Sequence, residues 1–133
     1  MNRAVSVSLL MARYLAGNDN LKEYGDIVIP RLLARLERSD AKSIHQQVAI
    51  QLEQLGGEVA AGGREREALR CFIIVSKTLF VHTISSRVSG YIFAMRNNIA
   101  LKSKAKEDVE AALQHFDSLP PSEREQFAKR CEN

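Results

Sequence analysis

Residues 71–84 read Cys-Phe-Ile-Ile-Val-Ser-Lys-Thr-Leu-Phe-Val-His-Thr-Ile, the most apolar run in this chain of 133 residues. The run lies within residues 68–106, which contain seven Lys or Arg residues and no Asp or Glu. A segment that is both hydrophobic and exclusively basic indicates a buried core element whose exposed edge meets something acidic. The acidic counterpart is another part of the chain, a partner protein, nucleic acid or a lipid surface.

The secondary structure of residues 71–84 is ambiguous, because half of these residues are β-branched. A short buried strand is therefore an alternative to a helix. The helix is favoured because the lead-in 64–70 is strongly helical and the chain offers no second strand to pair with this one. We predict a central helix over residues 64–82. Its inward side chains are expected to be Leu69, Phe72, Ile73, Ser76, Leu79 and Phe80.

The composition of the chain favours packed helices. It is 45% hydrophobic and 26% charged, which is typical of a globular protein with a core. Seven Gly and three Pro are too few for a fold with many tight turns, and Trp is absent. We predict a single all-α domain over residues 1–133, a compact bundle of six to seven helices arranged as antiparallel helical hairpins.

Helical spacing defines the first half of this bundle. A helix is expected over residues 3–16, ended by Gly17, and a second is expected to start at Asp26 with Pro30 in its first turn. A third follows Ser39-Asp40 and ends at Gly56-Gly57, so residues 56–63 are expected to form a Gly-rich loop. The expected inward sets are Val7, Leu10, Met11 and Tyr14, then Ile29, Leu32, Leu33 and Leu36, then Ala41, Ile44, Val48, Leu52 and Leu55.

Residues 26–57, two helices joined by a short Ser-Asp turn, resemble a single HEAT-type helical hairpin. The likeness covers 32 of the 133 residues, and the remainder does not continue it. Stacked repeats of this kind need about three units for stability. The resemblance therefore implies two antiparallel helices and nothing more.

Three helices are expected in the second half. Residues 84–100 start at Ser85 or Ser86, a seventh helix is capped by Ser103, and Ser122 to Glu125 form a capping box for the last one. The expected inward sets are Val88, Tyr91, Ile92, Met95 and Ile99, then Val109, Ala112, Leu113 and Phe116.

Catalytic and metal-binding patterns are not evident. The three histidines, His45, His82 and His115, have no partner at a chemically useful spacing, and Cys71 and Cys131 are too few and too far apart for a zinc site. The glycines of residues 56–63 lack the Lys of a phosphate loop. We therefore expect no catalytic, cofactor or metal site, and a protein that is not an enzyme.

The N-terminal residues lack the continuous apolar region of a secretory signal. No window of the sequence approaches the roughly 20 apolar residues that a membrane span needs. A cytoplasmic location is expected.

Charge is distributed unevenly along the chain. Residues 64–106 hold nine basic and two acidic residues, whereas residues 107–133 hold three basic and seven acidic ones. We expect the acidic C-terminal helices to pack beside the basic segment and neutralise it. The alternative is a basic surface offered to an anionic partner.

The apolar content of residues 71–95 exceeds what one helix face can bury in a small bundle, which is typical of an interface. We expect a non-enzymatic protein-interaction module or small regulatory adaptor that acts through an apolar-basic helical surface over residues 71–106. A symmetric homodimer is the commonest arrangement, followed by a groove for an acidic helix and by attachment to a membrane surface. The expected contact residues are Ile74, Val75, Val81 and Phe93.

The alternative function is a nucleic-acid-binding transcriptional regulator that uses the helix 84–100. Small polar and basic side chains occupy its outer face and the linker beyond it. The expected contacts to an anion or nucleic acid are Ser86, Arg87, Arg96, Lys102, Lys104 and Lys106.

Overall fold

The computed structural model describes residues 2–80 and 88–132, and within these ranges it contains α-helices and short 3-10 helices but no strand. The all-α prediction is confirmed. The α-helices are α1 (Asn2–Ala16), α2 (Lys22–Arg38), α3 (Gln46–Ala61), α4 (Glu65–Ser76), α6 (Val88–Ser103), α7 (Lys106–Ser118) and α8 (Pro121–Glu132). The 3-10 helices are η1 (Asp19–Leu21) and η2 (Ala41–Ser43).

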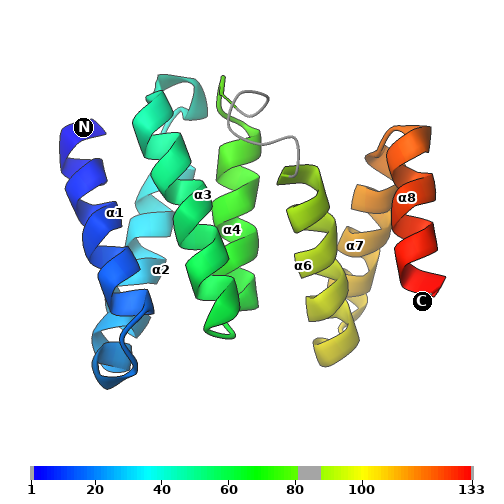
Figure 1. Cartoon of the computed structure of the whole chain (residues 1–133), viewed down its shortest axis with the longest axis horizontal. Helices are drawn as coiled ribbons and strands as arrows, with labels where there is room; N and C mark the ends of the chain where they lie inside the picture. Colours follow the sequence, from blue (N-terminus) through cyan, green and yellow to red (C-terminus); the bar gives the residue numbers. More distant parts are fainter. Residues whose placement is uncertain (1, 81–87, 133) are drawn as a thin grey trace.

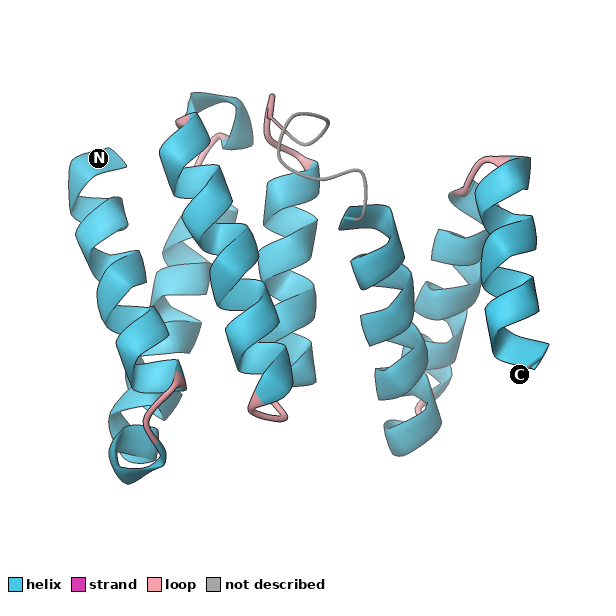
Figure 2. Ribbon diagram, in the orientation of Figure 1, coloured by secondary structure: helices cyan, strands magenta, loops and turns pink. Residues whose placement is uncertain are grey.

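The helices stand side by side along one axis, with the two ends of the chain at opposite ends of the array (Figure 1). Helix α3 packs against α1 and α4, α4 packs against α6, and α6 packs against α7. Helix α2 lies behind α1 and α3 in this view and packs mainly against α1 and α4 (Figure 2). The resemblance of residues 26–57 to one helical hairpin therefore misassigns the partners, because α3 pairs with α4 and not with α2.

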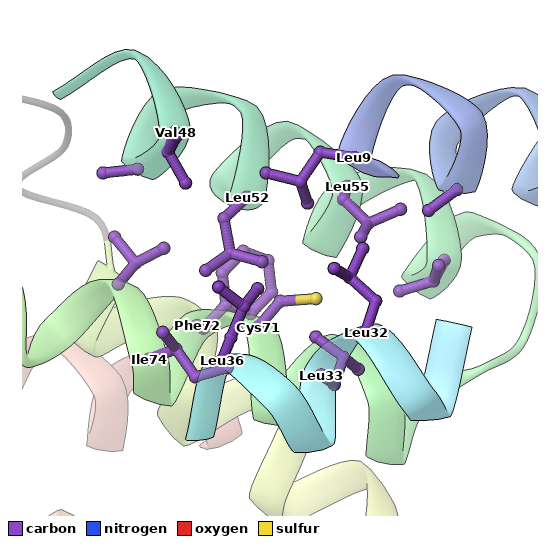
Figure 3. Close-up of a cluster of buried hydrophobic side chains, with 14 of the residues drawn as sticks. Leu9, Leu32, Leu33, Leu36, Val48, Leu52, Leu55, Cys71, Phe72 and Ile74 are labelled. Atoms are coloured by element: carbon purple, nitrogen blue, oxygen red, sulfur yellow. The ribbon is translucent and has the colours of Figure 1, made fainter. Parts of the chain in front are cut away.

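The core is one continuous cluster of aliphatic side chains from α1 to α4, extended by α6. Leu33 of α2, Leu52 and Leu55 of α3 and Cys71 of α4 are fully buried and converge between the helices (Figure 3). Burying side chains of this size contributes about 1.5–3 kcal/mol each. The cluster is the main source of stability for this part of the array.

The buried face of α1 differs from the expected one. Val7, Leu10, Met11 and Tyr14 are 53–64% exposed, and the opposite side of the helix faces α3 and α2. Both faces of α1 are apolar at helical spacing, so periodicity alone does not decide between them. The buried residues are Val5, Leu9, Ala12 and Leu15.

Helix α2 starts at Lys22, earlier than expected, so that Pro30 lies inside the helix. A proline there removes a hydrogen bond to the carbonyl of Asp26. The helix continues because its apolar face is buried. The expected inward set is confirmed, and all four members are between 0% and 6% exposed. That set is Ile29, Leu32, Leu33 and Leu36.

The Gly-rich loop expected at residues 56–63 is wrong for most of its length, because α3 runs without a break to Ala61. A Cβ atom at Gly56 would lie 2.7 Å from Cε1 of Phe72, so this glycine allows α4 to approach α3 closely. The turn consists of Gly62 and Gly63, and Gly63 has a positive φ of 84°. On the N-terminal side of α3, Asp40 caps η2, and α3 itself begins only at Gln46.

Helix α4 confirms the helical interpretation of residues 65–76 but ends six residues before the expected boundary. Ser76 Oγ donates to the carbonyl of Ile73 at 2.6 Å, and Thr78 Oγ1 donates to that of Val75 at 2.8 Å. Hydroxyl groups thus occupy carbonyls at the helix end and compete with its continuation. Leu79 is consequently 65% exposed and not inward.

The second half of the chain partly follows expectation. In α6 the expected inward set is buried or half-buried, whereas in α7 only Ala112 is fully buried and Leu113 is 58% exposed. Helix α8 starts at Pro121, a position where the missing N–H has little effect, and not after Ser122. Its described side chains are mostly polar or charged and exposed.

The two central glycines of α3 give a matched pair of variants. We expect Gly56→Ala to lower the free energy of unfolding by about 1–3 kcal/mol, since the new methyl group meets the ring of Phe72. Gly57→Ala should raise it by about 0.5–1 kcal/mol, because nothing lies within 4 Å of its Cβ position. Urea unfolding followed by circular dichroism measures both. Equal effects of the two substitutions would contradict the close packing of α3 on α4.

Candidate functional site

A groove of about 430 Å³ lies between α3, α4 and α6 and is lined mainly by apolar atoms. Helix α4 provides its floor, and α3 and α6 provide its walls. We call it the α3–α6 groove. Its lining residues are Glu53, Gln54, Gly57, Ala60, Phe72, Tyr91 and Met95.

The floor of the groove is held by two stacked rings. The ring of Phe72 lies 4.7 Å from that of Tyr91, with an angle of 23° between the planes. Phe72 is 2% exposed and rests against Gly56, so the missing side chain on α3 sets the depth of the ring. Stacked pairs of this kind contribute about 0.5–1.5 kcal/mol beyond the burial of their surface. The close contact between α3 and α4 therefore positions the groove.

The walls differ in character. Gly57 and Ala60 leave the α3 wall almost without side chains, and the α6 wall presents Tyr91 and Met95 one helical turn apart. The Glu53 carboxylate is half-buried at the edge, with no ion-pair partner among the described residues. The site offers apolar contact, a close approach to the α3 backbone and one negative charge.

Helix α6 is apolar on most faces because it is covered on both sides. Phe93 packs against Phe116 of α7 with ring centroids 5.5 Å apart. Arg96 donates from Nη1 to the carbonyl of Ala111 at 2.8 Å. Contacts to α4 on one side and α7 on the other thus account for the excess of apolar residues in this helix.

The residues expected to contact a partner protein are not brought together on one surface. Ile74 and Val75 are 4% and 0% exposed within the chain's own core, so they offer no surface to a partner. Phe93 is half-buried against α7. Val81 lies outside the described residues. The apolar surplus of residues 71–95 is used mainly to join α4 to α3 and α6.

Much of the positive charge of residues 64–106 is compensated within the chain. The carboxylates come from α2, α4 and α7, so the acidic C-terminal region supplies only some of them. The pairs are Arg64 with Asp26 at 2.5 Å and with Glu67 at 3.2 Å, Arg70 with Glu37 at 2.5 Å, Arg66 with Asp108 at 2.8 Å, Lys102 with Glu65, and Lys106 with Glu110 at 3.9 Å.

The residues expected to contact an anion or nucleic acid are not brought together as a free basic surface. Arg96 is half-buried against α7, Lys102 is paired with Glu65, and Lys106 lies near Glu110. Lys104 is exposed, with a positive φ of 52° at the turn before α7. Ser86 and Arg87 lie outside the described residues.

Sequence reasoning missed the groove because it treated Phe72, Tyr91 and Met95 as ordinary core residues. Only the distance between α3 and α6 turns these inward positions into a surface, and no sequence pattern reports that distance. The exposed basic face of α2, formed by Arg31, Arg35 and Arg38, agrees with the helical spacing of the sequence, which places these arginines opposite the inward leucines.

The thiol of Cys71 is buried. Burial raises the pKa of the Cys71 thiol to about 12, so the thiolate is scarcely populated near neutral pH. No group of three or more His, Cys, Asp or Glu side chains is arranged to hold a metal ion among the described residues.

Comparisons of this chain with protein-family models, with curated proteins and with solved structures find no match. Within residues 2–80 and 88–132, no helix has both the length and the apolar character required to cross a bilayer.

His115 should make the contact between α6 and α7 sensitive to pH. Burial lowers the pKa of His115 below its ordinary value near 6.5 and Arg96 lowers it further, while the backbone of Ser89 and Glu123 act in the opposite direction. The unfolded chain therefore binds this proton at a higher pH than the folded chain. The contribution of His115 to the free energy of unfolding is therefore fully present above about pH 6.5. It is lost as the pH falls through the lower pKa that His115 has in the folded chain.

Urea unfolding between about pH 5 and 8 tests this dependence. We expect the loss of stability at low pH to be smaller in His115→Gln than in the wild type. His45→Gln is the control, because His45 is exposed. An unchanged pH profile in His115→Gln would show that the buried imidazole is not the source.

Cys71 should resist modification in the folded protein. In a Cys131→Ser background, we expect a thiol reagent such as DTNB to react at least roughly 100-fold more slowly with native protein than with protein in guanidinium chloride. Absorbance of the released thiolate measures the rate. Rapid reaction of the native protein would contradict the burial of this thiol.

Proposed function

We propose that this protein is a non-catalytic protein-interaction module, a small regulatory adaptor, whose α3–α6 groove receives a helix of a partner protein. The observation that carries the proposal is the apolar groove floored by the stacked rings of Phe72 and Tyr91. Grooves between helices commonly bind an amphipathic helix through its apolar face.

The dimensions of the groove support an incoming helix. Its α3 wall extends from Glu53 to Ala60, which corresponds to roughly 10 Å, or two helical turns. The small residues Gly57 and Ala60 allow a second backbone to come close to α3. Met95 on the opposite wall has an unbranched side chain that adapts to the shape of a partner. An incoming helix would therefore use apolar residues one turn apart.

The charges around the groove favour a partner that carries Lys or Arg beside its apolar residues. Much of the basic charge of residues 64–106 is paired within the chain, whereas Glu53 has no ion-pair partner among the described residues. A basic side chain of the partner would gain a charge-assisted contact at the groove edge. We therefore retain the apolar part of the surface expected over residues 71–106 and assign the partner the opposite charge to the one expected.

Two other functions receive less support. A small-molecule site would enclose most of its ligand, whereas this groove is open along α3, where Gln54 and Gly57 are exposed. A nucleic-acid-binding regulator would need a free basic face on α6, and Arg96 and Lys102 both contact other parts of the chain. We also propose a cytoplasmic location, since the buried free thiol of Cys71 suits a reducing compartment.

Gly57→Arg tests the groove without disturbing the core. Gly57 is exposed with open space at its Cβ position, so a long side chain fits there and extends into the groove. The new guanidinium would also lie four residues after Glu53, where it can pair with that carboxylate. Quantitative affinity capture from the native host, wild type against variant, should show a partner that the variant loses.

The captured partner is then purified and titrated against both proteins by calorimetry. We expect Gly57→Arg to weaken binding at least about 10-fold, which corresponds to about 1.4 kcal/mol. Gln47→Arg is the matched control, because it adds the same charge to an exposed position of α3 outside the groove. The proposal fails if the partner binds both variants equally. It also fails if the wild-type protein captures nucleic acid and no partner protein.

A further inference from the structure

Helix α1 carries a row of large apolar side chains on the face that points away from the rest of the array. We call this row the α1 stripe, and its residues follow the i, i+3, i+4, i+7 spacing of one helix face. They are Val7, Leu10, Met11 and Tyr14, which are 61%, 53%, 55% and 64% exposed.

The position of the stripe makes its exposure unusual. Helix α1 is the first helix of the array and lies at one end of it (Figure 2). The terminal elements of stacked helical arrays normally have a polar outer face, because that face meets water. Here the neighbouring α2 adds Tyr24 and Ile27, which are 63% and 52% exposed. An exposed apolar row such as the α1 stripe is typical of a surface that binds another protein.

We propose that the α1 stripe binds the α1 stripe of a second copy of this chain, with the two helices antiparallel about a two-fold axis. The axis passes between Leu10 and Met11. This homodimer would be formed by α1, not by the residues 71–95 from which the sequence suggested one. It leaves the α3–α6 groove, which lies on other helices, free to bind a different protein.

The stripe is complementary to itself in this orientation. An axis between Leu10 and Met11 places Val7 of one copy opposite Tyr14 of the other, so that a small side chain meets a large one. Leu10 and Met11 then face each other across the axis. A two-fold interface requires one patch to match itself in this way. A parallel arrangement would instead place each residue against its own copy, Tyr14 against Tyr14.

Charges at the two ends of the stripe favour the same orientation. Arg3 lies one turn before Val7, and Asp19 follows the end of α1 in η1. Both side chains are exposed and have no ion-pair partner among the described residues. The antiparallel register brings Arg3 of one copy beside Asp19 of the other, twice in the dimer. A parallel register would bring Arg3 beside Arg3, which is repulsive.

The available area is consistent with a reversible dimer. The four side chains of the stripe, with their polar neighbours on the same face, can bury roughly 500 Å² from each copy, or about 1,000 Å² in total. That area lies at the lower end of specific interfaces, below the usual value of about 1,600 Å². We therefore expect dissociation on dilution and not a permanent dimer.

The other occupant to consider is a lipid surface, because α2 exposes Arg31, Arg35 and Arg38 beside the apolar end. Basic and apolar residues together are typical of attachment to anionic membranes. Self-association is favoured because the spacing and the end charges of the stripe match a second copy. Binding to vesicles by a protein that remains monomeric is an outcome that would overturn the proposal.

Sedimentation velocity over a wide concentration range is the first test. We expect the wild-type sedimentation coefficient to rise from the monomer to the dimer value, and Met11→Glu to weaken association at least 10-fold. Leu113→Glu is the matched control, because Leu113 is similarly exposed, at 58%, on α7. Gly57→Arg should also dimerise, which separates this proposal from the function of the groove. A wild type that stays monomeric, or a Met11→Glu variant that dimerises normally, would refute the proposal.

The same variants are examined by co-sedimentation with vesicles of phosphatidylcholine and phosphatidylserine. The stripe would be assigned to a membrane if the wild-type protein stays monomeric in solution but binds the vesicles, and if Met11→Glu abolishes that binding. No α1-dependent vesicle binding is expected.

Two further tests address the orientation. Arg3→Glu and Asp19→Arg should each weaken the dimer, and the double variant should restore it. In a Cys131→Ser background, Leu10→Cys near the axis should form a disulfide-linked dimer on mild oxidation. Arg3→Cys should not, because the two copies of residue 3 would be roughly 20 Å apart. Efficient cross-linking through residue 3 with none through residue 10 would contradict the antiparallel arrangement.

Discussion

The contact between Gly56 and Phe72 determines how the rest of the structure is arranged. A side chain at position 56 would collide with the aromatic ring at 2.7 Å, so the hydrogen of glycine allows α4 to lie against α3. Phe72, seated at that depth, stacks on Tyr91 and thereby fixes α6. Helix α6 in turn carries α7. The absence of a side chain at Gly56 therefore lets Phe72 join the aliphatic core, which spans α1 to α4, to the second half of the array. The same ring, stacked on Tyr91, forms the floor of the groove.

The sequence predicted the helices better than their contacts. Helical spacing located the inward face of α2 correctly, because Ile29, Leu32, Leu33 and Leu36 stand against a charged opposite face. It failed for α1, where both faces are apolar. The glycines at 56 and 57 were interpreted as a loop, since the chain alone does not show that Phe72 lies beside them. The groove could not be predicted for the same reason: its residues come from three helices, and their meeting depends on packing.

The carboxylate-free segment shows how charge and packing divide the same stretch of sequence. Its apolar residues join α4 to α3 and α6, while its basic residues reach outward to carboxylates on neighbouring helices. Arg70 binds Glu37 of α2, and that hydrogen bond raises the pKa of the guanidinium. The hydrogen bonds of Asp108 with Ser103 and Arg66 lower the pKa of its carboxyl group. The carboxylates that pair with the basic residues of this segment thus come from α2, the start of α4 and α7.

The two ends of the described array differ in polarity, and this difference would limit the size of an assembly formed as proposed above. Helix α1 presents apolar side chains outward, whereas the described side chains of α8 at the other end are mostly polar or charged. An array that was adhesive at both ends would add copies indefinitely and form fibres. In the dimer proposed above, the two α1 stripes cover each other, so association of this kind would stop at two copies. The described side chains of α8, which are mostly polar or charged, would not extend that assembly.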